Sequence, residues 1–92
     1  MIHGNLNPSG PNYQAWRAIF GSDSVPLKSD RPVQIDFGGE GKVECYALDI
    51  AALPLWKRAR LYVRASEYRL PRYQGGSLIR TEDVMLVEEK VA

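Results

Sequence analysis

The residues best suited to do chemistry form one basic and aromatic segment at residues 54–74. Its cations are Lys57, Arg58, Arg60, Arg64, Arg69 and Arg72, and its rings are Trp56, Tyr62, Tyr68 and Tyr73. Glu67 is the one acid in this segment. Arginine predominates over lysine, and the planar guanidinium pairs bidentately with phosphate or carboxylate and also stacks on bases. The segment therefore predicts a surface that binds an anionic partner.

The kind of anion is left open by these residues. The stretch 68–73 sets two rings beside two cations around Pro71, an arrangement that binds single-stranded nucleic acid. The alternatives are an acidic protein partner and a solvated helix face that binds no anion. We expect a non-catalytic binding module, with nucleic acid as the favoured partner. The expected binding residues are Lys57, Arg58, Arg60, Arg64, Arg69, Arg72, Tyr68 and Tyr73.

Charge is segregated along the chain, although the net charge is only +1. Residues 1–53 carry a net charge of −2, residues 54–80 carry +6 and residues 81–92 carry −3. This asymmetry indicates an anionic partner. The opposite interpretation is that acids of the C-terminal segment fold back and neutralise the arginines. Those acids are Glu82, Asp83, Glu88 and Glu89.

An enzyme is the competing class of function. Its most defensible form is a small metal-independent ribonuclease, in which Arg64 and Arg72 stabilise a developing phosphorane and Tyr73 serves as acid or base. His3 is the only histidine and Cys45 the only cysteine, so one chain cannot form a disulfide or a cysteine-based zinc site. We therefore predict no catalytic residue, no cofactor and no metal ligand.

The composition is that of one folded domain. The 92 residues are 45% apolar and 25% charged, which is close to the average for globular proteins. We expect a single domain over residues 1–92, with an irregular arm at 1–12. No apolar run approaches the roughly 20 residues that cross a bilayer, and the N-terminus lacks the pattern of a signal peptide. A cytoplasmic location without a membrane partner is expected.

Two periodic stretches must supply the core that positions the basic segment. The first has Tyr13, Trp16 and Phe20 at helical spacing between a capping Asn12 and the stop signal Gly21. This spacing predicts a helix over 13–20 whose apolar side is buried on a sheet.

The second periodic stretch follows a loop expected at 21–32. Apolar residues alternate over 33–37 and 43–48, on either side of a glycine-rich turn at 38–41. This alternation predicts a β-hairpin, and the glycine spacing is not that of a phosphate-binding loop. Cys45 shares one strand face with Val43 and Ala47, where we expect a buried and unreactive thiol.

The basic segment itself has an ambiguous period. We expect a short turn at 50–53 and then a helix from about Pro54 to about Arg64. On this helix the residues expected to face the core are Leu55, Ala59, Tyr62 and Val63. The residues expected to form a cationic ridge are Lys57, Arg60 and Arg64, at i, i+3 and i+7. A strand over 60–68 is the rival interpretation, because side chains also alternate there.

The C-terminal part is expected to complete the sheet. Residues 77–80 read as extended, 81–83 as a turn and 84–89 as a last strand, whose exposed edge would favour a homodimer. The predicted fold class is α+β: a small single domain with an N-terminal helix packed on a small antiparallel sheet that contains a central β-hairpin.

Overall fold

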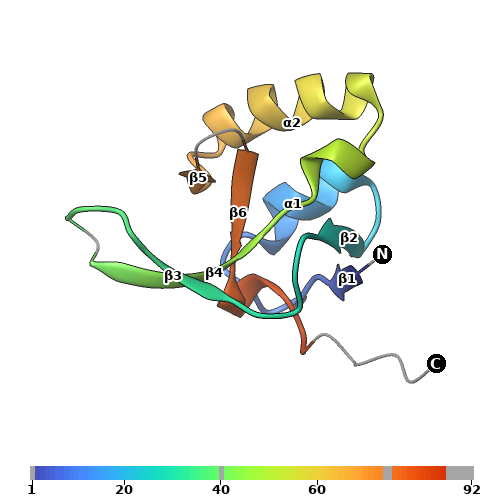
Figure 1. The fold of residues 1–92 in the computed structure, drawn as a ribbon. Coiled ribbons are helices and arrows are strands. Elements are labelled where there is room, and N and C mark those ends of the chain that lie inside the picture. The colour runs from blue at the N-terminus through green and yellow to red at the C-terminus, as the bar shows by residue number, and fades with distance from the viewer. Residues whose placement is uncertain (1, 40, 74–75, 87–92) are drawn as a thin grey trace.

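The described part of the chain combines two helices with two antiparallel sheets (Figure 1). The computed structural model describes residues 2–39, 41–73 and 76–86. Its strands are β1 (Ile2–Asn5), β2 (Ser24–Leu27), β3 (Val33–Asp36), β4 (Lys42–Ala47), β5 (Arg72–Tyr73) and β6 (Gly76–Arg80). Its helices are α1 (Tyr13–Phe20) and α2 (Leu55–Glu67), with single 3-10 turns at Ile50–Ala52 and Thr81–Asp83. The predicted α+β class is confirmed.

The predicted hairpin is the first half of the larger sheet. β3 and β4 pair with Ile35 opposite Val43. The turn between them has Gly38 and Gly41 at φ values of 77° and 76°, a region that glycine enters without steric cost. β4 also pairs with β6, and β6 with β5, so the strand order is β3-β4-β6-β5. The hairpin extends away from the helices in Figure 1.

The second sheet lies where no strand was predicted. β1 and β2 pair antiparallel, with His3 opposite Pro26. The irregular arm predicted at 1–12 and the loop predicted at 21–32 are therefore wrong for these residues. Proline and glycine suggested loops, but a strand with one partner in its sheet tolerates proline. Burial of Val25 and Leu27 holds β2 in place, and a local sequence pattern does not reveal such burial.

Helix α1 supplies the centre of the core. It has the predicted bounds, and it ends at Gly21 in the left-handed conformation, with φ at 69°. Trp16 is fully buried and belongs to one cluster with side chains of both sheets and of α2, including Val25, Ile79 and Leu61. A smaller cluster forms under the hairpin, around the buried Cys45.

Asp83 fastens the C-terminal 3-10 turn to the start of α1. Its side chain is fully buried. Asn12 donates to it from the backbone N (2.8 Å to Oδ1) and from Nδ2 (3.1 Å to Oδ2), so Asn12 precedes α1 as predicted but does not cap it with its side chain. A Cβ at Gly10 would lie 2.8 Å from the Asp83 Cα. The loop before α1 can therefore pass this turn only with glycine at that position.

Helix α2 forms as predicted, but a different side of it faces the core. Pro54 precedes its first turn, and the helix runs to Glu67, beyond the predicted end; the rival strand at 60–68 is wrong. Its buried residues are Leu61 and Ala65. The residues predicted to face the core, Leu55, Ala59, Tyr62 and Val63, are instead exposed. The buried stripe of α2 is narrow, and the small side chain of Ala65 beside Leu61 lets the helix pack closely on the core. Helix α1 is in contact with α2.

The predicted strand at 84–89 is wrong where the structure describes it. Residues 84–86 are not a strand, and Val84 forms only an isolated bridge with Leu6. Residues 87–89 lie outside the described residues. The extended stretch at 77–80 and the turn at 81–83 are confirmed as β6 and the 3-10 turn. The free edges of the larger sheet are β3 and β5, so the edge on which the homodimer prediction depended is not formed by 84–86.

These burial patterns predict opposite results for two apolar residues. Trp16→Ala should lower the free energy of unfolding by about 3–5 kcal/mol, because it removes a buried ring and leaves a cavity. Val63→Ala, on the exposed side of α2, should change it by less than about 0.5 kcal/mol. Urea unfolding of both variants provides the measurement. A loss at Val63 comparable to the loss at Trp16 would contradict the observed setting of α2.

Candidate functional site

The exposed side of α2 is apolar. Its side chains recur at i, i+4 and i+7 or i+8, so they form one stripe along the helix. We call it the outer apolar face; it consists of Leu55 (77% exposed), Trp56 (61%), Tyr62 (37%), Val63 (58%) and the exposed Ala59. Scattered exposed apolar residues are ordinary, but a contiguous stripe of large ones marks an interaction surface. Sequence reasoning identified this stripe and placed it in the core.

A groove runs along one side of the outer apolar face. Its volume is about 580 Å³. The groove is lined by Ile50, Ala51, Leu55, Ala59 and Tyr62, with Lys28 and Arg58 at its charged positions. It therefore continues the outer apolar face toward the turn at Ile50–Ala52.

Two arginines of α2, Arg58 and Arg60, are bonded to the protein's own backbone. Arg58 donates from Nε to the Leu53 carbonyl (2.9 Å) and from Nη2 to the Ala51 carbonyl (3.3 Å). Arg60 donates from Nη2 to the Ala18 carbonyl in the last turn of α1 (3.2 Å). A cation there satisfies a terminal carbonyl and complements the helix dipole. These bonds fix the rotation of α2, so the cations help to turn the apolar side outward.

The predicted cationic ridge is divided by this rotation. Arg60 is exposed, whereas Lys57 and Arg64 are half-buried. Arg64 forms an ion pair with Glu67 at 3.1 Å, and the Lys57 Nζ lies 5.4 Å from the centre of the Trp56 ring. The cations therefore flank the outer apolar face and do not form a separate ridge.

The predicted binding residues of the 68–73 stretch lie beyond the end of α2. Tyr68, Arg69, Arg72 and Tyr73 are all exposed. Arg72 donates to the Tyr62 carbonyl, and its guanidinium lies 5.7 Å from the centre of the Tyr62 ring. The structure thus links this stretch to the outer apolar face through Arg72.

The C-terminal acids in the described part of the chain do not neutralise the arginines of the basic segment by direct ion pairs. Glu82 pairs with Arg80 at 3.6 Å, and Asp83 binds Asn12. No ion pair joins either acid to an arginine of α2 or of the 68–73 stretch among these residues. Glu88 and Glu89 lie outside the described residues.

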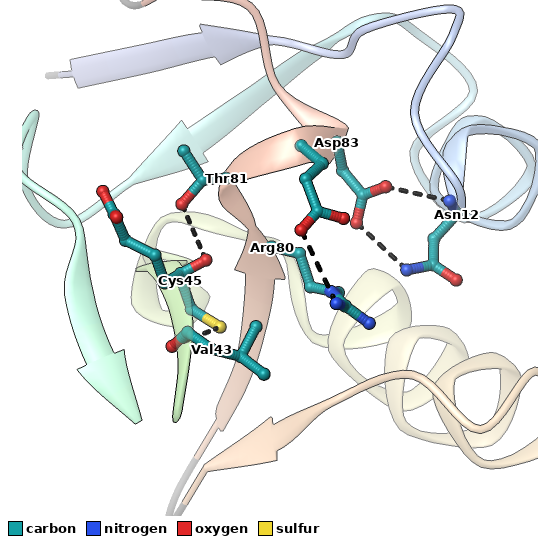
Figure 2. Close-up of polar contacts among 8 residues, drawn as sticks. Asn12, Val43, Cys45, Arg80, Thr81 and Asp83 are labelled. Atoms are coloured by element: carbon teal, nitrogen blue, oxygen red, sulfur yellow. Dashed lines mark hydrogen bonds and ion pairs between the residues drawn. The ribbon is translucent and has the colours of Figure 1, made fainter. Parts of the chain in front are cut away.

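A second group of polar residues lies beside β6 (Figure 2). Arg80 and Asp83 extend toward Asn12, on the side of β6 away from Cys45. Arg69, Arg72 and Arg80 line one cavity of about 370 Å³. Sequence reasoning missed Arg80 and Asn12, because they lie far along the chain from the basic segment.

The other groups that could bind a metal or react are the His, Cys, Asp and Glu side chains. Within residues 2–39, 41–73 and 76–86, no cluster of three or more His, Cys, Asp or Glu side chains could hold a metal ion. Cys45 is buried as predicted, and its Sγ lies 3.7 Å from the Val43 carbonyl. Burial raises the pKa of the Cys45 thiol, although the positive charge of Arg80 opposes part of this rise.

Comparison with protein-family models, with curated proteins and with solved structures gives no match. In the described part of the chain, neither helix has the length and apolar character needed to cross a membrane. The function is therefore inferred from the chemistry of the described surfaces.

The raised pKa of Cys45 predicts a pH dependence of stability. The folded state favours the protonated thiol, so this contribution is complete below the ordinary thiol pKa of about 8.5 and is lost as the pH rises through the higher folded value. Wild type should lose more unfolding free energy than Cys45→Ala between pH 7 and pH 9.5, as measured in urea. An equal loss in the two proteins would show that the thiol does not titrate differently on folding.

Proposed function

We propose that this chain is a protein-interaction module that binds an acidic partner through the outer apolar face of α2. The observation that carries the proposal is the outward position of large apolar side chains on a well-formed helix, with Leu55 and Trp56 the most exposed of them. Keeping such side chains in water forgoes the stabilisation of about 1.5–3 kcal/mol that burial of each would bring. A partner that covers them recovers this free energy.

The composition of the face is that of a protein interface. Tryptophan, tyrosine and arginine are enriched among the residues that dominate binding free energies, and Trp56, Tyr62 and Arg58 lie on or beside this stripe. Aliphatic Leu55 and Val63 have no ring to stack on a base, and they suit the apolar side of a partner helix. An amphipathic helix laid along α2 and its groove would cover the stripe.

The charges around the face favour an acidic partner. Lys28, Lys57, Arg58 and Arg60 surround it, and the nearby Glu67 already pairs with Arg64. A guanidinium that donates to a backbone carbonyl keeps its positive charge and its other N–H donors. Complementary charges of this kind steer association and select against basic partners. The expected partner segment carries apolar residues at helical spacing, flanked by Asp and Glu.

Nucleic acid is the second candidate. The observation that favours it is the pairing of exposed rings with cations: Lys57 lies over Trp56, and Arg72 over Tyr62. Bases could stack on these rings while phosphates meet the cations. Ribonuclease activity remains the other function predicted from the sequence.

A designed acidic amphipathic peptide tests the proposal. It should bind wild type and shift the amide resonances of α2 in an NMR titration, whereas a basic peptide with the same apolar pattern should not. Val63→Asp should weaken binding at least tenfold, because it places a like charge and a desolvated carboxylate in the contact. Gln14→Asp, at an exposed position of α1, is the matched control and should bind as wild type does.

Three results would contradict the proposal. Shifts in α2 caused by a single-stranded oligonucleotide and by neither peptide would favour nucleic acid. Sedimentation as a dimer that Val63→Asp dissociates would assign the face to a second copy of the chain. Cleavage of RNA without added metal, lost in Arg72→Ala or Tyr73→Phe, would favour the ribonuclease.

A further inference from the structure

A cavity of about 370 Å³ has a lining that shares no residue with the outer apolar face, although Arg72 of this lining lies over the Tyr62 ring. Its lining comes from segments that are distant in the sequence: Asn12 before α1, Phe37 in the hairpin, Arg69 and Pro71 after α2, Arg72 in β5 and Arg80 in β6. A volume of this order is within the range of small-molecule sites, about 300–1,000 Å³. The tertiary fold therefore gathers arginines that local structure would not bring together.

The charge of this cavity is positive. Its lining includes three arginines and no acid. Two carboxylates contact the lining residues in the described part of the chain: Glu82 lies 3.6 Å from the Arg80 Nη2, and Asp83 is bonded to Asn12. Both carboxylate oxygens of Asp83 are already bonded to Asn12. Hydrogen bonds from the neutral Asn12 do not cancel the charge of Asp83, so the three arginines exceed the two nearby acids, Glu82 and Asp83, by about one positive charge.

Arg80 has an unused donor at this site. Its Nε is buried and has no hydrogen-bond partner among the described residues. A buried N–H without an acceptor is unfavourable, and Arg80 is one of the residues that line the cavity. Figure 2 shows the Arg80 side chain on the same side of β6 as Asn12.

The backbone places an arginine where glycine is preferred. Arg69 has φ at 55° and is the only described non-glycine residue with a positive φ. It follows α2 in a Schellman motif, in which the Leu70 N donates to the Ala65 carbonyl (2.9 Å) and the Arg69 N to the Ser66 carbonyl (3.2 Å). Glycine would adopt this conformation with less strain. Strained residues of this kind occur preferentially at functional sites.

We propose that this cavity binds a small molecule that carries a phosphate monoester. Its charge of about −1.5 to −2 at neutral pH is attracted to the excess positive charge of the lining. Arg69, Arg72 and Arg80 hold the phosphate oxygens, since guanidinium N–H groups match phosphate geometry. Phe37 and Pro71 contact the attached organic group. This site is independent of the proposed function of α2.

Phenyl phosphate is the probe for this site, titrated at constant ionic strength and followed by calorimetry and amide NMR. It should bind more tightly than inorganic phosphate and shift the resonances of Phe37, Arg69 and Arg80, whereas phenol should not bind. Arg69→Gly should weaken binding at least tenfold and leave the melting temperature unchanged or higher, because glycine relieves the strained conformation. Arg80→Gln should also weaken binding at least tenfold.

Arg31→Gln is the matched control, because Arg31 is an exposed arginine outside the cavity. It should bind phenyl phosphate as wild type does. Equal losses in Arg31→Gln and Arg69→Gly would reduce the effect to net charge and overturn the proposal. Failure of phenyl phosphate to bind at 10 mM would also overturn the proposal. The same holds if a single-stranded oligonucleotide without a terminal phosphate binds the same residues more tightly than phenyl phosphate does.

Discussion

The rotation of α2 about its own axis is the constraint on which both surfaces depend. Packing of Leu61 and Ala65 into the core selects the side of the helix that is buried. Hydrogen bonds from Arg58 to the Leu53 carbonyl and from Arg60 to the Ala18 carbonyl hold that rotation from either side. Each such bond from a charged donor contributes roughly 1.5–3 kcal/mol, less at an exposed position. The apolar stripe faces outward as a result.

The end of α2 determines where the second surface forms. The left-handed conformation at Arg69 reverses the chain, and burial of Leu70 fixes the stretch that leads to β5. β5 pairs with β6, which brings Arg72 near Arg80. The arginines thus have two structural settings. Those within α2 bond mainly to backbone carbonyls or to Glu67, whereas Arg69 and Arg80 line an open cavity.

The elements with a clear local period were predictable from the sequence. Alternation around a glycine turn identified the hairpin, and helical spacing between Asn12 and Gly21 identified α1 with its bounds. Cys45 was placed correctly on the buried face of β4. The strands β1 and β2 were missed, because their glycine and proline residues suggest loops and only tertiary burial stabilises them.

The orientation of α2 was not predictable from its own pattern. The helix carries two apolar stripes, and the larger one, with Leu55, Tyr62 and Val63, was assigned to the core on the rule that the more apolar side is buried. The structure buries the smaller stripe instead. The sequence also did not predict that Arg80 lines a cavity, because contacts between β6 and the segments before α1 and after α2 depend on the whole fold.

Solvent exposure of the two tryptophans is the most direct test of the outward rotation of α2, because Trp16 lies in the core and Trp56 on the outer apolar face. The measurement is fluorine NMR of protein labelled with 5-fluorotryptophan, compared in H2O and D2O, with Trp56→Phe to assign the resonances. If α2 has this rotation, the Trp56 resonance should show a clear solvent isotope shift and the Trp16 resonance almost none. A Trp56 resonance as insensitive to solvent as that of Trp16 would contradict the outward rotation of α2.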